Sequence, residues 1–441
     1  MTNPFTRQID EALGTDMTPE VALRHEGADS LPSYFDVAGL ATASVGAAAR
    51  ELAALTGAGT VAVHQRRALI WFGASLRPEG WSLPDIWDPV AGDYATADGW
   101  IRLHTNAPHH RAAALSVLGC DATRDAVAET VRDWPGAALQ DAVVAAGGCA
   151  AAMHDMAGWA AHPQGRAVAA DPLIGWSVRG EGGGAATLQG LKVLDLTRVL
   201  AGPVATRFLA GFGADVLRID PPGWNEPGVE MEVTLGKRLA GLDLKTDEGR
   251  ATFEALLQGA DVFVHGYRPG ALAALGYGPD TLARLAPRAV EVTLDAYGWQ
   301  GPWAGRRGFD SLVQMSSGIA AEGMRRAGAA RPVPLPVQAL DHATGYLMAA
   351  AVLRALRRRA ATGEVMRARL SLARTAALLV SAGAGDLSAK LSPGTGDDLA
   401  PGIEETGWGA ARRVAFPVTL NGALPVWRYP AHPLRRDPAR W

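Results

Sequence analysis

Residues 191–220 constrain the fold of this chain more than any other stretch; they read LKVLDLTRVLAGPVATRFLAGFGADVLRID. Their first apolar run, 193–196, has the length and branching of a buried parallel strand. A turn follows at 201–203, then helical spacing over 204–209, and a second apolar run over 216–219. This order predicts a strand–turn–helix–strand unit, the repeating piece of a doubly wound α/β sheet.

The turn after such a strand faces a helix amino terminus, where phosphates bind well, so a nucleotide is the first ligand to consider. The turn carries Ala201-Gly202-Pro203 and lacks the Gly-x-Gly-x-x-Gly fingerprint of dinucleotide-binding proteins. The residues therefore indicate a Rossmann-like unit without a dinucleotide signature.

Two phrases in this stretch, VLDLTRVLAGP and LAGFGADVLRID, resemble the opening of the family III CoA-transferases, which include alpha-methylacyl-CoA racemase. The resemblance implies a Rossmann-like large domain with a parallel sheet, a small α+β domain, and CoA as co-substrate without a metal. It also implies a homodimer, since members form interlaced dimers.

The composition limits the partners and the cellular location to be expected. The formal net charge is −3 over 441 residues, which favours neither nucleic acid nor an anionic membrane surface. No apolar run approaches the roughly 20 residues that span a bilayer, and residues 1–14 are polar. Two cysteines, Cys120 and Cys149, provide no disulfide framework. We expect a cytoplasmic protein without membrane or nucleic-acid partners.

Changes in composition divide the chain into five parts. The turn pair Asp98-Gly99 predicts a hairpin inside the second part, and residues 163–184 are expected to be extended. The predicted parts are an exposed helical lead-in with a partial repeat (1–74), a small α+β domain (75–165), a linker (166–187), a Rossmann-like CoA-binding domain (188–380), and a mobile loop with a tail that returns to the large domain (381–441).

The chain contains an internal repeat. Asp36 and Asp341 each precede an Ala-rich helix that ends in Thr-Gly and is followed by a strand-like run. Residues that resemble the family's small domain precede the Rossmann-like half in this chain, whereas in the family they follow it. We interpret the chain as a permuted or partly deleted tandem, with Asp36 as a relic or a helix cap.

The family's nucleophile is an Asp before the Ala-rich helix, which matches Asp341 in PVQALDHATGYLMAAAVLRAL. The resemblance implies that its carboxylate forms a mixed anhydride and then an aspartyl-CoA thioester. Asp is also a favoured N-cap, so the residue alone leaves a capping role open. We expect the helix start and nearby backbone N–H groups to hold the pKa of Asp341 well below 7.

The CoA contacts carry over from four family segments. Lys245 is the implied phosphate partner, supported by Lys237 in a lysine-poor chain, and Leu242 lines the adenosine site. Basic family positions are Pro222 and Ala274 here, so we expect CoA to bind more weakly or with other anchors. The implied CoA-binding residues are Arg198, Val199, Leu200, Ala201, Leu242, Lys245, Tyr267, Arg268 and Tyr297.

The sequence favours transfer over racemisation. The racemase branch uses Gly-His-Asp, where this chain has Gly308-Phe309-Asp310, and Phe cannot transfer a proton. The only histidine cluster, His104, His109 and His110, has no Cys, Asp or Glu at ligand spacing, which argues against a metal site.

The sequence thus predicts a CoA-transferase that moves CoA between two carboxylic acids. The alternatives are an acyl-CoA racemase or isomerase, and a non-catalytic CoA-binding subunit that pairs with an active homologue.

Overall fold

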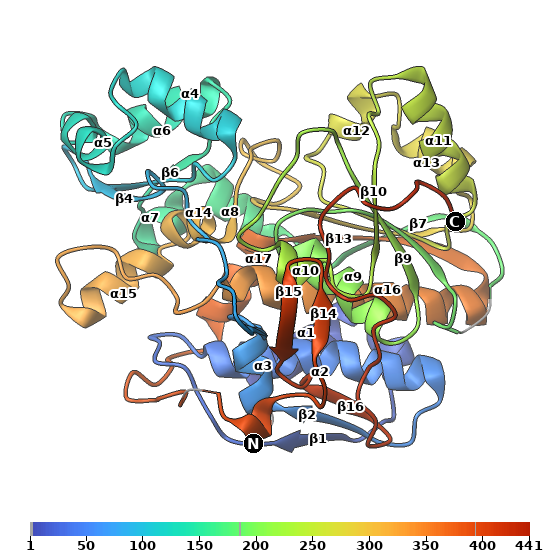
Figure 1. Ribbon diagram of the computed structural model, residues 1–441. Coiled ribbons are helices and arrows are strands. Elements are labelled where there is room, and N and C mark those ends of the chain that lie inside the picture. Colours follow the sequence, from blue (N-terminus) through green and yellow to red (C-terminus); the bar gives the residue numbers. More distant parts are fainter. Residues whose placement is uncertain (1–2, 185–186, 393) are drawn as a thin grey trace.

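The computed structural model describes residues 3–184, 187–392 and 394–441. Its main sheet has seven strands in the order β10-β9-β8-β11-β12-β13-β7 (Figure 1). All neighbours pair in parallel except β7, an edge strand antiparallel to β13. The strands are β7 (Gly175–Glu181), β8 (Lys192–Leu196), β9 (Asp215–Asp220), β10 (Arg238–Gly241), β11 (Val262–His265), β12 (Val290–Asp295) and β13 (Glu364–Ser371). The predicted α/β class is confirmed.

The stretch 191–220 forms the predicted unit of β8, helix α9 (Ala201–Gly211) and β9. Strands β8 and β9 are parallel, with Val193 opposite Val216. Successive residues of β8 point to opposite faces, so Val193 and Leu194 are fully buried in two separate clusters. Burial on both faces explains why this run is apolar throughout instead of alternating.

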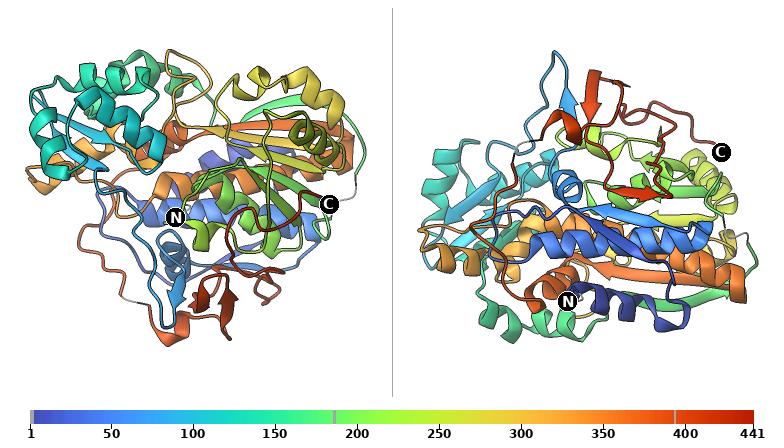
Figure 2. Two further views of the ribbon diagram at one scale, coloured as in Figure 1. Left: turned by 45° about the horizontal axis from the view of Figure 1, so that its top comes forward. Right: turned by 90° about the horizontal axis from the view of Figure 1, so that it is seen from below.

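Helices cover both faces of the sheet (Figure 2). One face packs against α11 (Asp247–Gln258) and α13 (Pro279–Leu285) through a cluster that includes Phe253 and Leu282. The other face packs against α9 and the long helix α16 (Ala339–Thr362).

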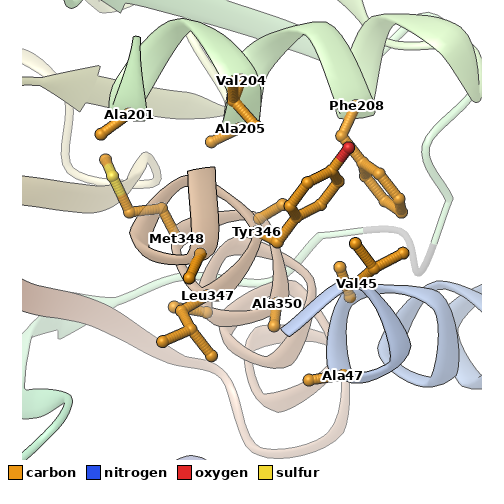
Figure 3. Close-up of a cluster of buried hydrophobic side chains, with 14 of the residues drawn as sticks. Val45, Ala47, Ala201, Val204, Ala205, Phe208, Tyr346, Leu347, Met348 and Ala350 are labelled. Carbon is orange, nitrogen blue, oxygen red and sulfur yellow. The ribbon is translucent and has the colours of Figure 1, made fainter. Parts of the chain in front are cut away.

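Helix α2 (Val37–Thr56) lies against α16 and forms a further layer of the core. Val45 of α2, Phe208 of α9 and Tyr346 of α16 belong to one buried cluster (Figure 3). Both α2 and α16 are rich in Ala, which allows their backbones to approach closely. Each ends at a left-handed glycine that follows Thr, with φ of 69° at Gly57 and 78° at Gly363.

A small α+β unit lies apart from the main sheet (Figure 1, cyan). It pairs β4 (Gly92–Ala95), β5 (Trp100–Leu103) and β6 (Ala150–Ala152), and its helices are α4 (Pro108–Leu118), α5 (Arg124–Val131) and α6 (Gly136–Ala145). The predicted hairpin is present, with Ala95 opposite Trp100. Ile101, Val127 and Leu139 help to form a buried cluster of the unit's own.

Segments from both ends of the chain form two further sheets of three strands. One combines β1 (Leu23–Glu26), β2 (Val61–His64) and β16 (Val418–Leu420); the other combines β3 (Leu76–Pro78), β14 (Glu404–Thr406) and β15 (Gly409–Arg413). The tail then reaches the main sheet, where Leu239 and Asp437 exchange hydrogen bonds of 2.7 and 2.8 Å.

Two segments differ from the sequence prediction. Residues 163–184, expected to be extended, contain helix α8 (Pro163–Ala170) and the edge strand β7. Pro163 occupies the first helical turn, where proline is well tolerated, and His162 accepts the Gln164 N–H at 3.1 Å. Residues 185 and 186 of the expected linker lie outside the described part.

The expected exposed lead-in is wrong as well. Helix α1 (Pro4–Leu13) buries Phe5, Ile9 and Leu13, which recur every fourth residue on one face. This periodicity anchors α1 in the main core. Residues 381–412, expected to be a mobile loop, include strands β14 and β15.

The other helices are short. None of the described helices is long and apolar enough to cross a bilayer. The short helices not yet named are α3 (Gln65–Trp71), α7 (Met156–Ala161), α10 (Glu230–Val233), α12 (Ala271–Ala274), α14 (Asp310–Ser316), α15 (Ile319–Ala327) and α17 (Leu372–Ser381).

Candidate functional site

Asp341 lies in the first turn of α16 and is 7% exposed. The sequence allows it to cap this helix, but Gln338 holds the N-cap position and Asp310 of α14 supplies the capping carboxylate. The backbone N–H groups of Leu340 and Asp341 donate to one Asp310 oxygen at 2.9 and 3.0 Å. Asp341 itself is therefore free of the capping role.

The surroundings raise the pKa of Asp341 rather than lower it. Burial is the main cause, and the nearby negative charge of Asp310 adds to it. The backbone N–H groups expected to lower the pKa of Asp341 bind Asp310 instead. Burial also raises the pKa of Asp310, to about 6, against the effect of these donors and of Gln314. The expected low pKa of Asp341 is thus wrong in direction.

A cavity of about 610 Å³ opens at the carboxyl ends of β8, β11 and β12. The chain leaves β8 toward β9 and β10, and leaves β11 toward β12 and β13, so the cavity lies where the strand order reverses. Ligands of doubly wound sheets bind at this switch point. Asp341 is part of the cavity wall.

Four arginines give this cavity a cationic lining: Arg198, Arg268, Arg306 and Arg307. Arg198 donates to the Tyr267 hydroxyl at 3.1 Å and lies over the rings of Trp224 and Tyr267, at 5.1 and 5.3 Å from their centroids. Arg268 is exposed and donates to the carbonyl of Gly305 at 3.2 Å. The lining therefore suits a polyanionic ligand.

The turn after β8 is strained. Val199 has a φ of 66°, a region that β-branched residues rarely adopt. Its N–H donates to Glu226 at 2.9 Å, and Glu226 also accepts hydrogen bonds from Arg218 and Trp224. Strain of this kind is typical of ligand sites, where the surroundings hold the backbone in place.

Sequence reasoning missed three residues of this cavity. Arg306 and Arg307 donate to Ala150 and Gly147 of the small α+β unit, at 3.2 and 3.1 Å, so they link the unit to the cavity. The available signal was their position directly before Gly308-Phe309-Asp310. Asp295, at the end of β12, is the third; burial raises its pKa to about 7.

The structure brings together most of the sequence-predicted residues but not all. Leu200 lines a second cavity, which also has Asp341 in its wall. Tyr297 is fully buried, with its hydroxyl 3.1 Å from Ser316, and does not line the large cavity. Those that line the large cavity are Arg198, Val199, Ala201, Tyr267, Arg268 and Asp341.

The two expected lysine anchors and Leu242 lie elsewhere. Lys245 is exposed and Leu242 packs against the cluster of α11, and neither lines the large cavity. Lys237 is fully buried, where its ammonium donates to Asp195 at 3.1 Å and to the Pro203 carbonyl at 3.0 Å. Lys237 therefore has a structural role, and the cavity's cations are arginines.

The histidines near the site are neutral at physiological pH. His104 stacks on Phe309 with centroids 3.7 Å apart, and burial lowers its pKa to about 3. Burial also lowers the pKa of His110, to about 4. Within the described ranges, no three His, Cys, Asp or Glu residues are arranged to hold a metal ion.

Comparison with known proteins gives a consistent picture. Residues 188–401 match the family model described as CoA-transferase family III. An acyl-CoA transferase of Fusarium pseudograminearum is 33% identical over 209 residues, which cover 43% of this chain and 45% of the relative. Succinyl-CoA:glutarate CoA-transferase of Homo sapiens is 34% identical over 192 residues, covering 40% of this chain and 43% of the relative.

The crystal structure of Rv3272 from M. tuberculosis aligns with a TM-score of 0.40 and 30% identity, over 44% of this chain and 56% of that one. The chain spans less than half the length of the relatives from Fusarium pseudograminearum and Homo sapiens. The resemblance found in the sequence is confirmed for residues 188–401, which match the model of CoA-transferase family III.

Proposed function

We propose that this protein is a CoA-transferase that moves CoA from an acyl-CoA to a second carboxylic acid. The observation that supports this most is the position of Asp341, a buried carboxyl in the wall of both a cationic cavity and a second, more apolar one. We further propose that the enzyme works in the cytoplasm, where its two free cysteines stay reduced.

The cationic cavity is the proposed CoA site. The diphosphate and ribose phosphate pair with its arginines, and the adenosine end lies near Tyr267. The thiol end then points toward Asp341, which belongs to the same cavity wall. Guanidinium groups bind phosphates with two parallel hydrogen bonds, so four arginines replace the expected Lys245 and the missing basic positions Pro222 and Ala274.

Asp341 is the proposed nucleophile. Its carboxylate attacks the acyl carbonyl of the donor and CoA thiolate leaves, which gives an acyl–Asp341 anhydride. The thiolate then attacks the Asp341 carbonyl, releases the first carboxylate and forms an Asp341–CoA thioester. The acceptor carboxylate repeats both steps in reverse, so each bond broken is matched by one formed and no ATP is needed.

The buried position of Asp341 affects this chemistry in two ways. Exclusion of water protects the anhydride from hydrolysis. The raised pKa of Asp341 means that the carboxyl must first lose a proton, so transfer should accelerate as pH rises.

Racemisation finds less support. Phe309 replaces the histidine of the racemase branch, and the neighbouring His104 is a weak base because burial lowers its pKa to about 3.

A homodimer remains a prediction, but its basis is weaker, since α16 is buried against α2 and α9 of its own chain. Light scattering at micromolar concentration tests the oligomeric state.

Covalent trapping tests the proposed function directly. The protein is incubated with an acyl-CoA, quenched with hydroxylamine or borohydride, and the modified residue is mapped by mass spectrometry. Modification of Asp341 supports the transferase, and modification of Asp36 would place the reaction in the other helix. Binding of CoA without modification would favour the non-catalytic subunit. Deuterium exchange at the alpha carbon would favour the racemase.

A further inference from the structure

A second cavity, of about 140 Å³, also has Asp341 in its wall. Both cavities share Val199, Phe309 and Asp341 in their walls. If CoA fills the cationic cavity with its thiol at Asp341, the group attached to that thiol extends into the second cavity. This step rests on the proposed function.

Apolar side chains dominate the outer wall of the second cavity. Leu83, Pro84, Ile86 and Trp87 come from the segment between β3 and β4, and Met231 faces the cavity from α10. Leu83 and Ile86 are 40% and 50% exposed, which is unusual for large apolar residues that line a cavity. An apolar group bound there would cover them.

The charged groups of this cavity are carboxyls. Glu232, Asp310 and Asp341 line it, and its described lining contains no Lys or Arg. His104, its one imidazole, is neutral because burial lowers its pKa to about 3. An adjoining cavity of about 210 Å³ continues past Ile86 and Trp87, and its described lining likewise contains no Lys or Arg.

A second carboxylate on the acyl group would therefore be desolvated without a cationic partner. Arg207 and Arg413 are not free to act as that partner, because both form ion pairs with Glu232. Their Nη1 atoms lie 3.5 and 3.4 Å from Glu232 Oε2. This differs from the cationic cavity, where four arginines line the wall.

The walls of the second cavity are fixed before any ligand binds. Glu232 accepts the N–H groups of Ser75 and Leu76 at 2.7 and 2.9 Å, which ties the start of the outer wall to α10. Asn106 donates to the Ile86 carbonyl at 2.8 Å and accepts the Asp88 N–H at 3.0 Å, which holds the other end. A preformed cavity selects its ligand by shape and charge.

We propose that the second cavity is the acyl site and that it selects uncharged, apolar acyl groups, aliphatic or aromatic, over acyl groups with a second carboxylate.

The test compares hexanoyl-CoA and benzoyl-CoA with succinyl-CoA and glutaryl-CoA. Two quantities are measured: Kd by calorimetry, relative to free CoA, and kcat/KM for transfer to one fixed acceptor. We expect hexanoyl-CoA or benzoyl-CoA to exceed succinyl-CoA in kcat/KM by on the order of 100-fold and to bind more tightly than free CoA. Equal or better values for succinyl-CoA would overturn the proposal.

Binding and turnover separate the two proposals. Tighter binding of the apolar thioesters without any transfer would support the acyl site while refuting the transferase. Transfer with a preference for succinyl-CoA or glutaryl-CoA would support the transferase while refuting the acyl site. If the acyl group changes neither Kd nor kcat/KM, the second cavity is not the acyl site.

A charge introduced at the outer wall gives an independent check. Leu83→Arg places a cation on an exposed loop position and should shift the kcat/KM ratio toward succinyl-CoA by about 10-fold or more. Val426→Arg is the matched control, because Val426 is 79% exposed and lines neither cavity. An unchanged ratio in Leu83→Arg, with the fold intact by circular dichroism, would contradict the assignment.

Discussion

Helices α2 and α16 pack against each other (Figure 3) and are both rich in Ala. The aspartates at their N-terminal ends nevertheless have opposite surroundings. Asp36 is the N-cap of α2, and its carboxylate accepts the Gly39 N–H at 2.7 Å. Asp341 lies inside the first turn of α16, and Asp310 makes the capping bonds there. A cap supplied by another helix leaves the Asp341 carboxyl available for chemistry.

The difference shows why an aspartate at a helix start is weak evidence of catalysis on its own. A capping carboxylate is already satisfied by backbone donors. Asp341 instead is buried next to a second carboxyl and lines two cavities, whereas Asp36 lines neither of them. The predictions below test whether this difference separates a catalytic helix from a structural one.

The largest expected effect is on transfer itself. Asp341→Asn keeps the size of the side chain but cannot form the anhydride, so activity should fall by at least about 10³-fold. Steady-state transfer assays measure this loss, and circular dichroism shows whether the fold persists. Activity within 10-fold of the wild type would rule out Asp341 as the nucleophile.

CoA affinity should depend on the cavity's arginines. Arg268→Ala removes an exposed cation that donates to the Gly305 carbonyl, so the fold should tolerate the change. Loss of a charge-assisted bond should weaken CoA by about 1–3 kcal/mol, or roughly 5- to 150-fold in Kd. Calorimetry measures this, with Lys245→Ala as the matched control outside the cavity. A larger effect in Lys245→Ala would place CoA beyond the carboxyl end of β10 instead.

The pH dependence of transfer should respond to Asp310. The proposed reaction needs ionised Asp341, so the rate should rise as pH passes its pKa. Removing the negative charge in Asp310→Asn favours the ionised form, which lowers the pKa of Asp341 and moves the midpoint toward lower pH. A pH–rate profile of kcat/KM measures the shift. A midpoint that stays in place or rises would show that the two carboxyls do not interact.

The raised pKa of Asp341 also has a consequence for stability. A carboxyl whose pKa is higher in the folded than in the unfolded protein stabilises the fold while protonated, and this stabilisation is lost as pH rises. Asp341→Asn removes that loss, so the variant should have the higher Tm at pH 8. The difference should vanish below about pH 4. Thermal melts at both pH values test this; a lower Tm at pH 8 would contradict it.

The sequence predicted what depends on local patterns. The apolar run 193–196 and the Asp98-Gly99 turn produced the parallel unit and the hairpin. The sequence could not predict that Asp310 caps α16, because Asp310 and Asp341 are 31 residues apart in sequence and meet only in the folded chain. Lys245 failed as a cavity residue for the same reason: a charge on a loop carries no information about where the loop lies.

The smallest expected effect concerns the other helix. Asp36→Ala removes the Gly39 cap bond, which should lower the free energy of unfolding by roughly 0.5–2 kcal/mol. Transfer activity should stay within a few-fold of the wild type, since Asp36 lines neither cavity. The pair of variants then behaves oppositely at pH 8: loss of the Asp341 carboxylate stabilises the fold and abolishes activity, while loss of the Asp36 carboxylate destabilises the fold and spares activity. If Asp36→Ala abolished transfer in a protein that remains folded, the two helices would share the chemistry.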